Sequence, residues 1–194
     1  MKRVLVLVDG FNLFHAVNEL SPGFADLDIR SLASRLINRR TEKIIGVEYF
    51  ASLITHLNKQ TIQTQERYLL ALRESGVKVI LGRFRPRSTI CTRCGLRELR
   101  HVEKETDVNL ATAFVTHAFD GNCDRVLLFS ADSDMKGVIS LVKTRFPEID
   151  IRLVSTVRYL QPVYRSIGTL VDGQIRLSHE LVKNHQFERR LEGC

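Results

Sequence analysis

The sequence predicts an α/β fold built on a doubly wound, mostly parallel sheet that is flanked by helices. Short apolar runs such as 4–8 and 125–129 are bounded by Asp, Gly or Ser, which is typical of buried parallel strands. Segments with helical periodicity, most of them ten or more residues long, separate these runs. Helical crossovers of this kind are what parallel strands require.

The first half of the chain alternates amphipathic helices with strands rich in β-branched residues. Asp28 is a candidate N-cap, and Gly76 ends the helix that starts at Asn58 or Thr61. In chain order, the predicted elements are a strand at 3–8, helices at 12–19 and 28–39, a strand at 44–54, a helix to residue 74, and a strand at 77–84.

The second half begins with an Arg-rich segment, residues 85–103, that is expected to leave the sheet as a loop insertion. Gly121 marks the turn after the next helix, and Ser178 is a candidate cap for the last one. The predicted elements are a helix at 106–119, a strand at 125–129, a helix at 135–145, a strand at 151–154, a helix at 158–166, an edge strand at 174–177, and a helix from 178 to 184.

Length and composition favour a single domain over residues 1–194. Hydrophobic residues make up 44% of the chain and charged residues 26%, so a core can form without disulfides. No apolar run approaches the roughly 20 residues of a membrane span. Asp9 and Asn12 interrupt the first apolar run too early for a signal peptide. We therefore expect a cytoplasmic protein without a membrane partner.

Positive charge is concentrated in the predicted insertion. The chain has a net charge of +7, so a polyanion such as nucleic acid is the expected partner. Arginine dominates there, and a guanidinium can bind a phosphate through two hydrogen bonds. The candidate nucleic-acid-binding residues are Arg83, Arg85, Arg87, Arg93, Arg97 and Arg100. A solvated basic loop without a specific partner is the alternative.

Four aspartates follow strands or open a helix. Asp9 ends the first apolar run, and Asp132 and Asp134 follow a later one. Asp107 opens a helix. The carboxyl ends of parallel strands meet in one crevice, where carboxylates repel one another unless they are protonated, hydrogen-bonded or neutralised by a cation. Oxygen ligands suit Mg²⁺ or Mn²⁺. Each aspartate taken alone can instead be a helix cap.

Three further polar residues accompany these aspartates. Asn12 follows Asp9 by three residues and can return to the same crevice, and Ser130 can donate a hydrogen bond that orients a carboxylate. Lys104 lies one turn before Asp107 and can share its helix face. Together these residues form a candidate site for metal-dependent phosphate chemistry.

Three short motifs follow one another in a specific order. They are Asp9-Gly10-x-Asn12 after the first strand, Glu103-Lys104-x-x-Asp107-Val108 at the start of a helix, and Ser130-x-Asp132-x-Asp134 after a later strand. Their sequence and order resemble the NYN domain, in the LabA-like branch of the PIN-like nucleases. The resemblance implies a PIN-like fold, binding of Mg²⁺ or Mn²⁺ by the four aspartates, and endoribonuclease activity on RNA.

The roles of the site residues follow from this resemblance. A bound cation would activate a water and neutralise charge on the phosphate. Lys104 would contact a phosphate oxygen, and Asn12 would orient a water or the phosphate. The chain departs from the family pattern at Glu105, which follows the lysine in place of a small residue, and at Ala131, which replaces a glycine. Neither change removes a carboxylate.

Two other functions compete with a nuclease. One is a catalytically quiet NYN module that binds RNA or a protein partner, although a pure binding surface gains little from clustered like charges. The other is a receiver-like or phosphatase fold with an acceptor aspartate after the third strand. The sequence disfavours the second, because that strand ends in Arg83-Phe84-Arg85.

Cys91 and Cys94 form a Cys-x-x-Cys knuckle that is typical of zinc sites, and His101 follows as a possible third ligand. The fourth ligand would be His56, Cys123, a water or a partner subunit. Two reduced thiols in a loop are the alternative. A shared zinc ion, or pairing through edge strands, would favour a homodimer.

Aromatic side chains divide into two predicted groups. Phe84 and Tyr159 are the candidate platforms for base stacking. The phenylalanines of the helical segments are expected in the core, and they are Phe11, Phe14, Phe114 and Phe119.

Overall fold

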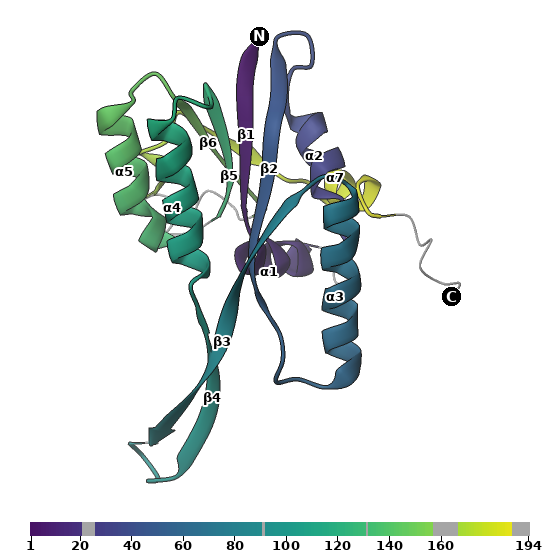
Figure 1. The fold of residues 1–194 in the computed structure, drawn as a ribbon, viewed down its shortest axis with the longest axis vertical. Helices are drawn as coiled ribbons and strands as arrows, with labels where there is room; N and C mark the ends of the chain where they lie inside the picture. Colours follow the sequence, from purple (N-terminus) through teal and green to yellow (C-terminus); the bar gives the residue numbers. More distant parts are fainter. Residues whose placement is uncertain (21–25, 91, 131, 157–166, 188–194) are drawn as a thin grey trace.

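A computed structural model of the protein describes residues 1–20, 26–90, 92–130, 132–156 and 167–187. In this part of the chain, seven strands form one sheet in the order β4-β3-β2-β1-β5-β6-β7 (Figure 1). The strands are β1 (Lys2–Asp9), β2 (Glu42–Leu53), β3 (Lys78–Ile90), β4 (Arg97–Lys104), β5 (Arg125–Phe129), β6 (Asp150–Ser155) and β7 (Gly173–Arg176). β3 and β4 are antiparallel, and the other neighbouring strands are parallel.

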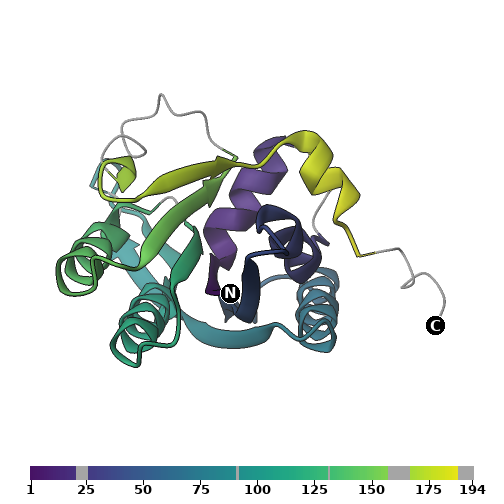
Figure 2. The ribbon, with the colours of Figure 1, turned by 90° about the horizontal axis from the view of Figure 1, so that it is seen from above.

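Helices cover both faces of this sheet (Figure 2). On one face lie α1 (Gly10–Leu20), α2 (Ile29–Leu36), α3 (Lys59–Glu74) and α7 (His179–Asn184). On the other face lie α4 (Thr106–Phe119) and α5 (Lys136–Arg145). The predicted doubly wound, mostly parallel α/β fold is therefore confirmed.

The alternation of side chains along β1 explains why this strand is apolar throughout. Its valines belong to the core cluster under α1 and α3, and Leu5 and Leu7 belong to the cluster under α4 and α5. A strand that is covered on both faces has no position for a solvated side chain. The same alternation directs Asp9, two residues after Leu7, toward α4.

The segment predicted as a loop insertion, 85–103, is instead part of a two-stranded antiparallel ribbon. β3 has its last partner in β2 at Arg83 but continues to Ile90, paired with β4. Figure 1 shows this ribbon projecting well beyond the body of the protein. The sequence of this segment predicts a loop because it contains Pro86 and many charged residues. Proline is tolerated here because, past Arg83, one edge of β3 pairs with no other described strand.

The predicted helix at 158–166 lies outside the described residues. Elsewhere, the described helices are all too short or too polar to cross a membrane.

Candidate metal centre and nucleic-acid interface

The ends of β1 and β5 lie side by side at the point where the strand order reverses. From β1 the chain moves outward through β2 and β3, and it later returns to β5 on the opposite side of β1. Val8 pairs with Phe129, so Asp9 and Ser130 follow paired positions in neighbouring strands. Open α/β sheets bind their ligands at such a switch point.

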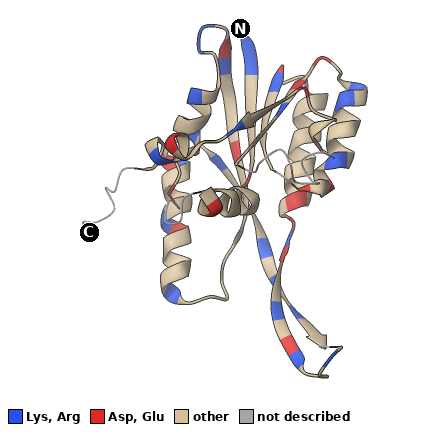
Figure 3. Cartoon of the chain, turned by 180° about the vertical axis from the view of Figure 1, so that it is seen from behind, with Lys and Arg blue, Asp and Glu red and all other residues tan. Residues whose placement is uncertain are grey.

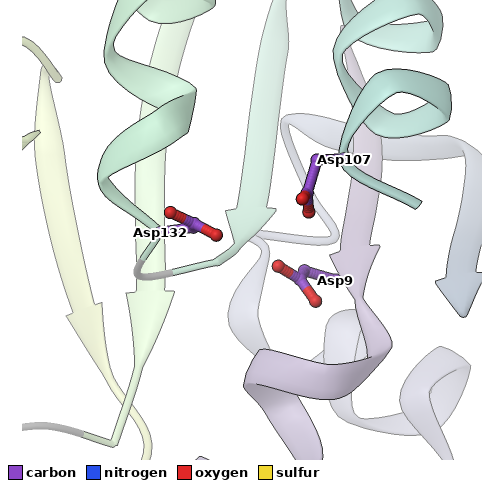
Figure 4. A group of neighbouring side chains, drawn as sticks. All are labelled: Asp9, Asp107 and Asp132. Atoms are coloured by element: carbon purple, nitrogen blue, oxygen red, sulfur yellow. The ribbon is translucent and has the colours of Figure 1, made fainter. Parts of the chain in front are cut away.

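Three aspartates meet at this point (Figure 4). Asp9 ends β1, Asp107 lies in the first turn of α4, and Asp132 follows β5. One carboxylate oxygen from each lies within 4.8 Å of the other two. Among the described residues, no other trio of His, Cys, Asp or Glu side chains has this spacing. Asp9 is 2% exposed, whereas Asp107 is open to solvent, so the group lies between the core and the surface.

Hydrogen bonds fix the carboxylate of Asp9. The backbone N–H of Asn12 donates to Oδ1 at 3.0 Å, and the Asn12 side-chain amide donates to Oδ2 at 2.6 Å. The Ser130 hydroxyl also donates to Oδ2, at 3.2 Å. Asp9 thus caps the start of α1 and lies in the crevice at once, so the two interpretations of this residue do not exclude each other.

Burial and mutual repulsion disfavour ionised carboxylates in this group. Burial raises the pKa of Asp9 above its ordinary value; hydrogen bonds oppose this rise, and the charge of Asp107 adds to it. Burial also raises the pKa of Asp107, and the charge of Asp132 raises it further. A divalent cation relieves such repulsion, and Mg²⁺ and Mn²⁺ prefer carboxylate oxygens. The donor set therefore fits either ion.

Asp132 and Asp134 have different environments. Oδ1 of Asp132 accepts the backbone N–H of Asp134 at 2.9 Å and so caps a short 3₁₀ turn, Ser133–Met135. The Ser130 hydroxyl oxygen accepts the N–H of Asp132 at 3.2 Å, which joins this turn to Asp9. The Asp134 side chain is exposed and is not one of the three that meet.

The start of α4 is held against the base of the ribbon. Gly82 is required there, because a Cβ at this position would overlap the carbonyl oxygen of Lys104. The Thr106 hydroxyl donates to Oε1 of Glu103 at 2.5 Å. These contacts fix the backbone just before Asp107, and they place the exposed Lys104 three residues from it, at the end of β4.

Glu105 has a left-handed backbone conformation, with a φ of 82°. Glycine is the residue best suited to this conformation. The resembling family pattern has a small residue here, and the structure shows a physical reason for it. The Glu105 side chain forms an exposed ion pair with Arg83 at 2.5 Å.

Basic residues recur along the ribbon, where they appear as blue bands in Figure 3. Cross-strand partners lie on the same face, as do alternate residues of each strand. The face comprises Arg83, Arg85, Arg87, Arg100 and Lys104. Arg87 lies directly opposite Arg100, and like charges in such a pair repel each other. A bound polyanion would remove this repulsion.

Acidic neighbours neutralise only part of this charge. Arg100 forms an ion pair with Glu98 at 2.8 Å, whereas Arg85 and Arg87 form none with the described residues. Arg97 is on the other face, and Arg93 is exposed in the turn at the tip. The structure thus brings most of the predicted arginines onto one surface.

Within the described residues, the structure does not bring the predicted zinc ligands together. Cys91 lies outside them, and Cys94 is exposed at the tip of the ribbon. His101 is four residues beyond Arg97 along β4, which is roughly 13 Å from the tip. It stacks on His56, with ring centroids 4.0 Å apart. Zinc at the cysteine pair stays a prediction.

The prediction of core phenylalanines was wrong for Phe11, Phe14 and Phe119, which are 54%, 52% and 61% exposed. Phe114 is buried, as predicted. Helical periodicity does not specify which apolar face the sheet covers, and α1 buries other residues. Tyr159 lies outside the described residues.

Comparison with known proteins identifies the fold and the family of the chain. The crystal structure of a protein of unknown function from Vibrio parahaemolyticus RIMD 2210633 is similar over 91% of this chain and 93% of that one, with a TM-score of 0.62 and 16% identity. This likeness shows a shared fold. No curated protein matches the chain. The family model of the NYN domain matches residues 3–155, a range that contains Asp9, Asp107 and Asp132. The match leaves membership of the LabA-like branch as a prediction. The chain belongs to the NYN domain family.

Proposed function

We propose that the protein is a divalent-cation-dependent endoribonuclease. The observation that carries the proposal is the meeting of Asp9, Asp107 and Asp132 at the switch point of the sheet. Their oxygens suit Mg²⁺ or Mn²⁺, and their mutual repulsion is a cost that a cation would remove. Membership of the NYN family, which is of nuclease type and generally RNA-associated, supports RNA as the substrate.

The residues of the site would have distinct roles in catalysis. The three aspartates would hold the cation, which when bound lowers the pKa of a water and neutralises charge on a phosphate. Asn12 and Ser130 position Asp9 through the hydrogen bonds described above. Asp134, on the neighbouring turn, would add negative charge, and its charge already raises the pKa of Asp107. Lys104, exposed at the base of the ribbon, would contact a phosphate oxygen.

The basic face of the ribbon would bind the RNA backbone on its approach to the aspartates. Phosphate contacts give affinity without recognising the base sequence, so this surface would bind RNAs of different sequence with similar affinity. The ribbon begins at Gly82 and Lys104, next to the start of α4. A strand that followed the ribbon toward the body would therefore be led to Asp107.

The test is cleavage of labelled single-stranded and hairpin RNA in Mn²⁺, in Mg²⁺ and in EDTA. Wild type should cleave internally with either metal and not in EDTA. Asp132→Asn should lose cleavage while keeping its fold, as judged by circular dichroism. Binding of these RNAs by wild type without cleavage in any metal would favour the catalytically quiet module instead.

A further inference from the structure

A cavity of about 650 Å³ lies between α1, the end of β2 and the first half of α3, on the face of the sheet that α1 and α3 cover. Gly10, which follows Asp9 directly, forms part of its wall, and so does Glu103 at the base of the ribbon. Its exposed surface is mostly apolar. Such a pocket is large enough for a nucleobase with its ribose.

Aromatic rings line this cavity from two directions. Phe11 and Phe14 project from α1, and each is more than half exposed. Both contact the ring of His15 edge-on, at centroid distances of 4.4 and 5.6 Å. Phe84 lines the cavity from the ribbon, and His56 packs against it at 4.7 Å. Exposed rings at a cavity mouth leave faces on which a base can stack.

A buried donor and a half-buried acceptor also face this cavity. Tyr49 is 7% exposed, and its hydroxyl makes no hydrogen bond with a described residue. Gly10 allows the Tyr49 ring to pack directly against the start of α1, since a Cβ there would lie 2.5 Å from the hydroxyl. Burial, then the charges of Asp9 and Glu103, raise the pKa of Tyr49, so the hydroxyl stays protonated. A hydroxyl that lines a cavity can donate a hydrogen bond to a ligand bound there.

Glu103 supplies the acceptor. Its Oε1 accepts the Thr106 hydroxyl, and Oε2 has no hydrogen bond with the described residues. A carboxylate can accept the N–H groups of a base edge. Glu103 and Asp26, which also lines the cavity, would repel a phosphate. The lining therefore fits an uncharged aromatic ring with polar edges better than it fits an anion or a purely apolar chain.

We propose that this cavity binds an unpaired nucleobase of the RNA strand whose neighbouring phosphate lies at Asp9, Asp107 and Asp132. The inference rests on the proposed function, because it assigns the cavity to the same substrate. The base stacks on Phe11, Phe14 or Phe84 and hydrogen-bonds to Tyr49 and Glu103. Cleavage is consequently restricted to unpaired RNA and favours particular bases at one position next to the cut.

The experiment scans a short single-stranded RNA with one abasic nucleotide at each position in turn. Affinity is measured by fluorescence anisotropy in EDTA, so that no cleavage occurs. Wild type should lose about 5- to 150-fold in affinity at one position and little elsewhere. Phe14→Ala should weaken binding of the intact RNA and reduce the loss at that position. Phe119→Ala, a change at another phenylalanine that is more than half exposed, in the last turn of α4, should alter neither.

Three outcomes contradict the inference: a flat abasic scan, equal weakening of intact and abasic RNA by Phe14→Ala, or the same response to Phe119→Ala. Tyr49→Phe removes only the hydroxyl and should change which base is preferred at the sensitive position. Cleavage in Mn²⁺ is measured in parallel. A flat scan with metal-dependent cleavage would overturn the base site and leave the nuclease standing. A position-specific abasic effect without cleavage in any metal would support the base site and overturn the nuclease activity.

Discussion

The Ser130 hydroxyl donates a hydrogen bond to Oδ2 of Asp9 across 121 residues of sequence, at 3.2 Å. The same oxygen of Ser130 accepts the backbone N–H of Asp132. One side chain thus joins two of the three aspartates that meet at the switch point. The relative placement of Asp9 and Asp132 depends on this serine.

Ser130→Ala should therefore weaken Mn²⁺ binding and RNA cleavage by about 10- to 100-fold without unfolding the protein, because groups that orient metal ligands have effects of this size. Ser133→Ala, a change at an exposed serine of the same turn, is the matched control and should have little effect. The measurement is the cleavage rate as a function of Mn²⁺ concentration. Equal rates for the two variants would show that the hydrogen bond to Asp9 has no role.

The basic face of the ribbon makes a prediction about salt. Replacing Arg85 and Arg87 with glutamine should flatten the plot of log affinity for single-stranded RNA against log salt by about 0.7 for each phosphate that the variant no longer neutralises. The change should be similar for RNAs of different sequence, because backbone contacts carry no sequence information. Arg145→Gln removes an exposed arginine from the end of α5 and should leave the slope unchanged. An unchanged slope in the ribbon variant would contradict a role in binding.

The left-handed conformation of Glu105 predicts a stabilising substitution. Glu105→Gly should raise the free energy of unfolding by up to about 1 kcal/mol, since relief of the backbone strain outweighs the greater entropy of glycine in the unfolded chain. Glu105→Ala keeps the strain and removes the exposed ion pair with Arg83, so it should be neutral or slightly destabilising. Urea denaturation measures both. Alanine that stabilises as much as glycine would indicate that the side chain, not the backbone, is unfavourable.

The interaction of Asp124 with Arg3 predicts how the stability of the protein depends on pH. The Arg3 side chain and then its backbone N–H donate to this carboxylate at 2.6 and 2.7 Å, which lowers the pKa of Asp124 to about 2. A lowered pKa contributes stability above the ordinary value near 3.8, and this contribution is lost as the pH falls toward 2.

Asp124→Asn should consequently lower the melting temperature at pH 7, and the difference from wild type should shrink as the pH falls from 4 to 2. Asp120→Asn, at the end of α4, is the control at an exposed aspartate. Thermal unfolding followed by circular dichroism across this pH range gives the comparison. A difference that stays constant down to pH 2 would show that the carboxylate charge is not responsible.

Local sequence was sufficient to predict the sheet and most of the aspartate site. The apolar runs of β1 and β5 lead directly into Asp9 and Ser130, and the geometry of parallel sheets brings these strand ends together. Asp9, Ser130 and Asp132 could therefore be placed without long-range information. The separation of Asp134 from the group depends on the 3₁₀ turn at Ser133–Met135, whose geometry periodicity does not encode.

The ribbon and the cavity could not be predicted, because both depend on contacts between distant segments. Pro86 suggests a loop until its strand is known to have a free edge. Phe11 and Phe14 have the pattern of core residues, but α1 packs through another face. The stacking of His56 on His101 joins residues far apart in sequence and has no local signal.

The claim on which the proposed activity depends is that Asp9, Asp107 and Asp132 bind a divalent cation. The most direct measurement is a titration of wild type, Asp107→Asn and Asp134→Asn with Mn²⁺ in the absence of RNA. Electron paramagnetic resonance monitors the binding of the ion. The account predicts saturable binding by wild type, a loss of at least tenfold in affinity for Asp107→Asn, and a smaller loss for Asp134→Asn, which lies outside the group of three. Equal affinity of wild type and Asp107→Asn for Mn²⁺ would contradict it.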